Sequence, residues 1–308
     1  MVAAGHVVGW EQFPLTAPRE PAAATGTVAP IAAGDVLRLA AGDAVLEIDR
    51  ATGLVRRYAR GGRTLLTGGA PDFWRAPTDN DIGSGVPKSH AMWKQFSRNR
   101  RVDGVAGEGD AIVVRHDMGV GSVKTVTRWT MAADGTVRAE VDFTPLRTTL
   151  PDPLRVGLAF RTPAALDRVR WFGRGPHETY ADRKTGGLVA IWQGALADQY
   201  HGYARPQESG SKQDVRWIAL TGAGVPGLRV TGARPLSVNA LPFPYDDLET
   251  ARHSSDIRPH GDGTLLIDAA QAGVGGDTGW NLDGRAHMPY RIAVKPLSYS
   301  FTIGADRP

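Results

Sequence analysis

Acid–base chemistry near neutral pH is one possible use of a short polar stretch in the middle of the chain. His177 stands beside Glu178, and Asp182, Arg183 and Lys184 follow closely. A histidine next to a carboxylate can exchange protons near pH 7, and such a pair can also hydrogen-bond a sugar. The same composition more often forms a structural ion-pair loop. Both interpretations remain open from these residues alone.

A second polar cluster lies between a proline and a glycine. Asp79, Asn80 and Asp81 follow Pro77 and precede Gly83. Their carboxylate and amide oxygens suit a hard cation or the hydroxyls of a sugar. More often, such a cluster is an Asx-turn that satisfies its own backbone.

A glycine-rich stretch near the C-terminus is predicted to be a shaped loop that presents a tryptophan. Residues 271–280 read Gln-Ala-Gly-Val-Gly-Gly-Asp-Thr-Gly-Trp, and glycine lets a backbone take positive φ and approach its neighbours closely. The indole of Trp280 can stack on the apolar face of a sugar ring or anchor another domain. The alternative is a core tryptophan that merely follows a turn.

Short alternating strands make up most of the chain around these stretches. Runs rich in β-branched residues recur from residue 35 onward, with glycine and Asp-Gly punctuation between them. No segment predicts a long amphipathic helix, although residues 91–96 and 244–251 fit short helical turns. The 38 glycines and 21 prolines also fit many turns. The sequence therefore predicts an all-β fold, a large antiparallel sandwich.

Composition narrows the possible partners. The net charge is only +4, from 36 basic and 32 acidic residues without a basic block, which argues against nucleic-acid binding. No run approaches 18 apolar residues, and the N-terminus lacks the pattern of a signal peptide, so we expect a cytoplasmic chain without a membrane partner. With no cysteine, a disulfide framework, a thiolate zinc site and a cysteine nucleophile are all excluded.

The first residues predict a strand that has no partner nearby in the sequence. Residues 6–15 alternate as a strand, and residues 16–33 are rich in Ala, Pro, Gly and Thr, as is typical of a linker. We therefore expect the chain to open within the last strand of a preceding domain.

Five motifs resemble the C-terminal region of the multidomain β-galactosidases of glycoside hydrolase family 2, in the same order. They are Trp-Arg-Ala-Pro-Thr-Asp-Asn-Asp-Ile-Gly (74–83), Gly-Pro-His-Glu-Thr-Tyr-Ala-Asp-Arg (175–183), Arg-Pro-Gln-Glu-Ser-Gly (205–210), Leu-Glu-Thr-Ala-Arg-His (248–253) and Gly-Val-Gly-Gly-Asp-Thr-Gly-Trp (273–280). The resemblance implies that residues 35–308 form the family's terminal β-supersandwich, which is related in fold to galactose mutarotases. Residues 1–15 would be a remnant of its immunoglobulin-like domain, and residues 16–34 a linker.

The resemblance also implies an accessory role. In that family the catalytic acid/base and nucleophile are two glutamates on a (β/α)₈ barrel upstream of the matched region, and the metal sites lie on the barrel side. We therefore expect no catalytic residue, metal or cofactor on this chain, and a partner that is the β-galactosidase barrel domain or large subunit. The family's loop tryptophan stacks on the β-galactoside, and here that residue is Trp280. Asp79, Asn80, His177 and Glu178 are further candidate sugar contacts.

Two alternatives remain. The first is a stand-alone carbohydrate-binding domain that uses Trp280, Asp79 and Asn80. The second is an aldose epimerase of the mutarotase kind, with His177 as the acid and Glu178 or Glu208 as the base. A mutarotase site resembles two histidines and a glutamate around one hexose, and His201 or His253 would have to supply the second histidine.

Overall fold

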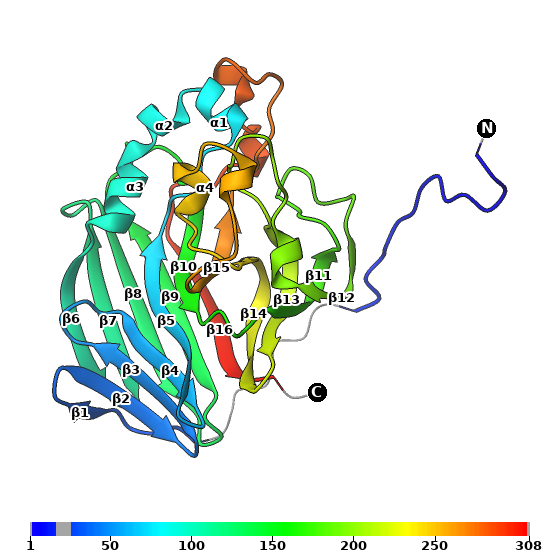
Figure 1. The fold of residues 1–308 in the computed structure, drawn as a ribbon. Helices are drawn as coiled ribbons and strands as arrows, with labels where there is room; N and C mark the ends of the chain where they lie inside the picture. Colours follow the sequence, from blue (N-terminus) through cyan, green and yellow to red (C-terminus); the bar gives the residue numbers. More distant parts are fainter. Residues whose placement is uncertain (1, 17–25, 307–308) are drawn as a thin grey trace.

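The computed structural model describes residues 2–16 and 26–306, which are mostly β (Figure 1). The strands are β1 (Ile31–Ala33), β2 (Val36–Ala41), β3 (Ala44–Asp49), β4 (Val55–Arg60), β5 (Arg63–Asp72), β6 (Arg101–Glu108), β7 (Ala111–Met118), β8 (Val123–Met131), β9 (Val137–Pro145), β10 (Arg155–Thr162), β11 (Arg168–Gly175), β12 (Leu188–Ala195), β13 (Lys212–Gly222), β14 (Val225–Leu241), β15 (Gly263–Gln271) and β16 (Leu297–Ala305). The helices are short: α1 (Asp79–Gly83), α2 (Val86–Ser89), α3 (Ala91–Arg98) and α4 (Asp247–Thr250), with 3₁₀ turns η1 (Leu196–Gln199), η2 (Ser254–Asp256), η3 (Leu282–Gly284) and η4 (Met288–Tyr290).

One antiparallel sheet links all of these strands. Its order is β1-β2-β3-β4-β5-β10-β15-β14-β16-β9-β8-β7-β6, and β13 branches from β14 to carry β11 and β12. The sheet curls so that β2–β5 face β7–β9 across a shared core, in which Leu39 and Leu46 belong to the same apolar cluster as Ile112 and Trp129. The predicted large antiparallel sandwich is therefore confirmed.

Alternation along the strands explains why the sheet buries one face. In β8 every second residue is buried, from Val123 to Met131, and β9 shows the same period over most of its length. Side chains of a strand point alternately to opposite faces, so this pattern puts one face into the core and leaves the other partly solvated.

A second apolar cluster fixes α2 and α3 to one end of the sandwich. Phe73, which follows β5, packs edge-on against Trp93 of α3 with ring centroids 5.5 Å apart and against Phe143 of β9 at 5.1 Å. Such edge-to-face pairs add to the stabilisation from burial. This cluster anchors the segment that leads from β5 into α1, and α1 supports the candidate site.

The N-terminal segment differs from the expectation. Residues 2–16 contain no strand, and a single strand without neighbours has no sheet to join. Their polar contact with the body is made by Gln12, whose side chain donates to the carbonyl of Val189 and accepts from its N–H, at 3.0 and 2.6 Å. β1 pairs with β2, so the sheet already begins within residues 16–34, the expected linker. Residues 17–25 of that expected linker lie outside the described residues, and the immunoglobulin-like assignment stays a prediction.

A helix must be long and apolar to cross a membrane. Within residues 2–16 and 26–306, every helix is too short or too polar to cross a bilayer.

Candidate functional site

Four segments that are distant in the sequence meet at one end of the sandwich. They are α1, the loop around residues 177–184, the loop around residues 200–210, and the glycine-rich loop over residues 272–284. Figure 1 shows the last of these, in orange and red, beside α1. Together they line a pocket of about 230 Å³ whose walls include Asn80, Tyr180, Arg183, Tyr203, Glu208 and Gly275. The structure thus brings most of the predicted site residues to one surface.

The Asp79–Asn80–Asp81 cluster forms the first turn of helix α1 and not an isolated Asx-turn. Thr78 is the N-cap: its hydroxyl accepts from the N–H of Asp81, and the Asp81 carboxylate accepts from the N–H of Thr78 at 3.0 Å. This reciprocal capping box satisfies two helix-end donors. Asp79 is exposed and accepts from Gln207 at 3.0 Å. Of the three side chains, only that of Asp81 satisfies a local backbone group, so the Asx-turn interpretation holds for the local backbone contact of Asp81 and not for the whole cluster.

Asn80 and Gly83 of α1 form a support for the glycine-rich loop. The Asn80 amide donates to the carbonyls of Thr278 at 3.0 Å and of Gly284 at 3.3 Å. A side chain at position 83 would place its Cβ 1.9 Å from the carbonyl oxygen of Gly279, so only glycine allows the loop to lie against α1 here. These contacts immobilise the backbone next to Trp280.

Two charged side chains fix the start of the same loop. Arg75 is 1% exposed; it pairs with Asp81 and donates to the carbonyls of Ala272 at 2.7 Å and Gly273 at 2.9 Å. Asp182 accepts from the N–H groups of Val274 at 2.9 Å and Gly275 at 2.7 Å. Such charge-assisted hydrogen bonds are among the stronger ones in proteins. No local sequence pattern predicts either anchor, because each contact joins segments that are distant in the chain.

The side chain of Trp280 is free at the tip of this supported loop. It is 80% exposed, so it is not a core tryptophan. It lies in a part of the chain where other large apolar side chains are also exposed, namely Ile82, Leu282, Met288 and Tyr290. A large exposed apolar patch on a soluble protein usually marks a binding surface, and these exposed side chains are candidates for one.

Glu178 is held at the centre of a hydrogen-bond network, whereas its neighbour His177 is not. One carboxylate oxygen of Glu178 accepts from Arg183 and from the hydroxyl of Tyr203; the other accepts from Ser209 at 3.2 Å and the N–H of Gly210 at 2.8 Å. His177 is exposed and has no hydrogen bond or ion pair within the described part of the chain. The two residues do not form an acid–base pair in this arrangement.

Glu208 is the more deeply buried carboxylate of the site. It is 2% exposed and accepts from the hydroxyls of Tyr180, at 3.1 Å, and Tyr245, and from the amide of Asn239 at 3.3 Å. Burial raises the pKa of Glu208, because removal from water disfavours its charged form. Its donors come from three other segments, so sequence spacing gave no signal for this network.

The titration of Lys212 makes the burial of the polar residues around Glu178 testable, because it should make the stability of the chain depend on pH. Burial lowers the pKa of Lys212 to about 8, although Glu178 opposes the shift, and its ammonium donates to the carbonyl of Gly210 at 2.9 Å. The unfolded lysine titrates near 10.4, so the unfolded chain binds more protons between about pH 8 and 10.4. Below about pH 8 the folded chain carries the full cost of burying the charged ammonium. As the pH rises from about 8 to 10.4 the folded lysine loses its proton and this cost disappears, so the free energy of unfolding should increase.

Urea unfolding of the parent chain and of Lys212→Met at several pH values measures this effect as a difference in the free energy of unfolding. The parent should gain roughly 3 kcal/mol relative to the variant between pH 8 and 10.4, because each pKa unit corresponds to about 1.36 kcal/mol. Lys88→Met, at an exposed lysine of α2, is the matched control and should show no such gain. A pH-independent difference for Lys212→Met would contradict the assignment.

The remaining histidines do not complete a mutarotase-like constellation in this arrangement. His201 and His253 are exposed; the ring of His201 packs edge-on against Tyr203, and His253 caps η2. No group of three or more acidic or histidine side chains within the described residues is arranged to hold a metal ion. The arrangement that the structure does present is a polar pocket beside an exposed indole, which suits contacts to a neutral polyol.

Comparisons with known proteins agree on one family. Residues 40–303 match the family model described as beta galactosidase small chain. The chain is 33% identical over 244 residues to the beta-galactosidase of Priestia megaterium, covering 78% of this chain and 23% of that protein. It is 30% identical over 319 residues to beta-galactosidase 2 of Enterobacter cloacae, covering 97% of this chain and 30% of the relative. This chain thus spans less than a third of the length of either relative.

Among solved structures, one similar in fold is a galactose mutarotase related enzyme from Lactobacillus acidophilus. It has a TM-score of 0.48 and 8% sequence identity, and the match covers 88% of this chain and 97% of that one.

Proposed function

The chain belongs to the beta-galactosidase small-chain family, and from that premise we propose that it is the accessory terminal domain of a β-galactosidase of glycoside hydrolase family 2. It completes the wall of an active site whose catalytic glutamates lie on a partner barrel, as a domain or as a large subunit. Trp280 gives that site an aromatic platform for the β-galactoside.

The observation that carries this proposal is the support beneath Trp280. Trp280 is 80% exposed, and leaving an indole in water is less favourable than covering it. The fold nevertheless holds this ring in its exposed position, because the backbone on either side of Trp280 is bound by Asn80 and packed against Gly83. A rigid aromatic ring loses little entropy when it stacks on a sugar, so a fixed exposed tryptophan is well suited to that role.

A partner domain accounts for the other exposed apolar residues of the same part of the chain. Leu282 and Met288 are 76% and 73% exposed. The relatives are more than three times as long as the segment they share with this chain, so most of their length is available to cover such a surface. We therefore assign the surface around Leu282 and Met288 to contact with the catalytic partner.

The alternatives from the sequence receive no comparable support. For a stand-alone carbohydrate-binding domain, the Asn80 amide is already used by Thr278 and Gly284, and Asp79 is engaged by Gln207 and Arg205. For an aldose epimerase, His177 has no carboxylate in hydrogen-bond contact within the described residues.

Trp280→Ala should weaken substrate binding in the assembled enzyme but leave the fold intact. One lost stacking surface should cost about 1–3 kcal/mol, which is roughly 5- to 150-fold in the dissociation constant. The unfolding free energy of this chain should change by less than about 0.5 kcal/mol, because the ring is mostly exposed. Equilibrium binding of a β-galactoside and urea unfolding measure the two quantities.

Two matched variants sharpen this test. Trp280→Phe keeps an aromatic face and should retain most of the affinity, whereas Leu282→Ala removes a neighbouring exposed apolar side chain and should act on assembly rather than on sugar binding. An unfolding penalty of several kcal/mol for Trp280→Ala, or full affinity in the assembled enzyme, would remove Trp280 from the site.

A further inference from the structure

The turn between β7 and β8 presents an apolar side chain on a backbone conformation that its residue type avoids. Residues 119–121 read Gly-Val-Gly, and all three have positive φ, at 68°, 50° and 74°. Glycine takes such angles freely, whereas a β-branched residue takes them only under strain. The side chain of Val120 is also 85% exposed, so no burial within this chain offsets the strain.

The turn is held in this shape by its own surroundings. The carboxylate of Asp117 accepts from the N–H of Gly121 at 2.7 Å, and the hydroxyl of Ser122 donates to the carbonyl of Gly119 at 2.7 Å. Asp117 and Ser122 are only 3% and 2% exposed. A strained residue persists only where the surrounding contacts over-determine its conformation. Val120 is therefore fixed at the tip of the turn.

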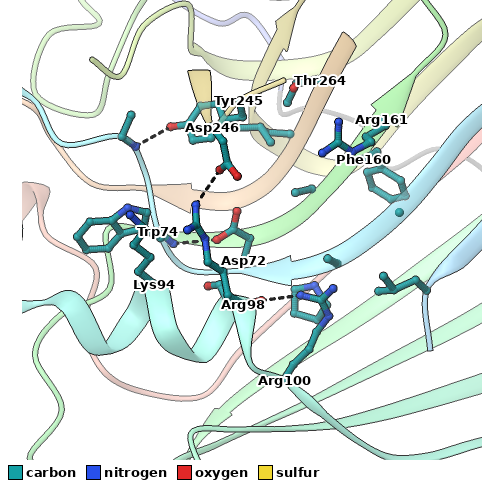
Figure 2. Close-up of a pocket in the computed structure, with 18 of the residues that line it drawn as sticks. Asp72, Trp74, Lys94, Arg98, Arg100, Phe160, Arg161, Tyr245, Asp246 and Thr264 are labelled. Atoms are coloured by element: carbon teal, nitrogen blue, oxygen red, sulfur yellow. Dashed lines mark hydrogen bonds and ion pairs between the residues drawn. The ribbon is translucent and has the colours of Figure 1, made fainter. Parts of the chain in front are cut away.

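Helix α3 supports the turn from behind. A Cβ at position 119 would lie 2.1 Å from the ring of Phe96, so the backbone of the turn lies directly against this ring. Phe96 packs edge-on against the fully buried Trp93, with ring centroids 5.6 Å apart. On another face of α3, Arg98 pairs at 3.0 Å with Asp246, which precedes α4 (Figure 2). The helix beneath the turn is thus held on two faces.

The end of the neighbouring strand adds a second exposed apolar side chain. Leu146 follows β9; its N–H donates to the carbonyl of Ser122 at 2.8 Å, and its side chain is 53% exposed. Arg147 is exposed as well, and within residues 2–16 and 26–306 its guanidinium has no carboxylate oxygen within 4.0 Å. We call Val120, Leu146 and Arg147 the turn patch. Two apolar side chains beside an unpaired cation fit an apolar recess that is bordered by a carboxylate.

The turn patch and the Trp280 loop are carried by the same row of helices. The loop lies against α1, the turn lies against α3, and α2 joins these two helices. One apolar cluster also underlies both, because it contains Met118 and Val123 beside the turn and Ala272 and Ile292 beside the loop. Figure 1 shows the three helices along one end of the sandwich. A partner that covers the Trp280 loop therefore approaches the end that carries the turn patch.

We propose that the turn patch is a second anchor for the catalytic partner: Val120 and Leu146 enter an apolar recess of that partner, and Arg147 pairs with a carboxylate at its rim. This inference rests on the proposed accessory function and adds a contact to it. Burial in the recess offsets the strain of Val120, which nothing in the isolated chain does. A second copy of this chain fits less well, because a symmetric contact between two such patches would bring the two Arg147 guanidinium groups together.

Biolayer interferometry tests the proposal with the full 308-residue chain and the immobilised barrel-containing polypeptide of the same enzyme. Val120→Asn should weaken binding about tenfold or more, because it replaces an apolar anchor with a polar side chain. Val120→Leu keeps an apolar side chain and should retain most of the affinity. Ile31→Thr is the matched control and should bind like the parent, because Ile31 is 63% exposed on β1, at the end of the sandwich opposite the helices (Figure 1).

Two further measurements separate the roles within the patch. Asparagine adopts positive φ more readily than valine, so Val120→Asn should unfold at the same urea concentration as the parent or at a higher one. Arg147→Gln should weaken binding of the barrel-containing polypeptide about two- to fivefold and reduce its dependence on salt. Unchanged affinity and salt dependence in Arg147→Gln would remove the carboxylate rim from the proposal.

The failure of this inference is distinguishable from that of the proposed function. If the parent chain does not bind the barrel-containing polypeptide, both are overturned. If the parent binds and Val120→Asn binds equally well, only the turn patch is overturned. A lower urea midpoint for Val120→Asn would mean that Val120 serves the fold of this chain, which also contradicts the proposal. Analytical ultracentrifugation that finds a dimer of the parent, dissociated by Val120→Asn, would assign the patch to a second copy instead.

Discussion

The purified 308-residue chain should release no nitrophenol from an aryl β-galactoside, and activity should appear only when a barrel-containing partner is supplied. Positioned acid–base catalysis contributes about 10²–10⁴-fold to a glycosidase, and the nucleophile adds to this. We therefore expect the isolated chain to fall short of the assembled enzyme by at least about 10⁴-fold in kcat. A colorimetric assay with and without the partner measures this difference.

Two carboxylates of the candidate site, Glu178 and Glu208, are already committed to protein donors, which fits the expected inactivity. Glu178 accepts four hydrogen bonds and Glu208 accepts three, so their oxygens are committed to tyrosine, arginine, serine, amide and backbone donors. A retaining glycosidase needs two carboxyl groups about 5–5.5 Å apart with the sugar between them. A carboxylate that already serves this many protein donors is a structural element and is poorly placed to attack a sugar.

Glu208→Gln serves as the control for this experiment. Turnover that scales with the amount of purified chain, survives repeated purification and disappears in Glu208→Gln would falsify the accessory role. If Glu208→Gln lowered the activity of the assembled enzyme and the isolated parent chain were inactive, Glu208 would instead support the surface that contacts the catalytic partner.

The strands that follow from local alternation were predicted well. β8 is one of the alternating runs that predict strands from residue 35 onward, and residues 91–96, predicted as a short helical turn, lie within α3. By contrast, β5 contains Gly68, Gly69 and Pro71, which weaken any strand signal, and it forms because β4 and β10 pair with its two edges. The glycines at positions 173 and 175 weaken the strand signal of β11 in the same way.

The candidate site was predictable only in part, because its supports are distant in the sequence. Glycine spacing predicted a shaped loop at residues 271–280, and the structure places Trp280 at its exposed tip, while its contact with sugar stays a prediction. Arg75, however, donates to Ala272 across 197 positions, and Asp182 reaches Val274 across 92. No local pattern encodes such contacts, since they depend on how β5, β11 and β15 are ordered in the sheet.

Arg75→Met should destabilise the chain by about 3–5 kcal/mol, the second large effect that we expect. The variant leaves the Asp81 carboxylate buried without its cation and removes the donors to the carbonyls of Ala272 and Gly273. Loss of one partner from a buried ion pair carries a penalty of this size because the other charge remains away from water. Urea unfolding of the isolated chain measures it directly.

The neighbouring surface pair offers a matched control. Arg205 contacts Asp79 at 3.4 Å, and both side chains are about half exposed or more, at 48% and 64%. Arg205→Met should therefore cost less than about 1 kcal/mol. If both methionine variants were equally mild, the buried pair would not be the support that its geometry indicates.

A double variant separates the ion pair from the loop contacts. Arg75→Met with Asp81→Asn removes both charges, so it should be less destabilised than the sum of the two single variants. It should still lack the donors to Ala272 and Gly273, and limited proteolysis should then cut within residues 272–284 faster than in the parent. Because those carbonyls lie at the root of the loop that carries Trp280, a chain that is stable but rapidly cut there should also bind a β-galactoside more weakly once assembled. Unchanged proteolysis in the double variant would mean that Asn80 and Asp182 hold the loop without Arg75.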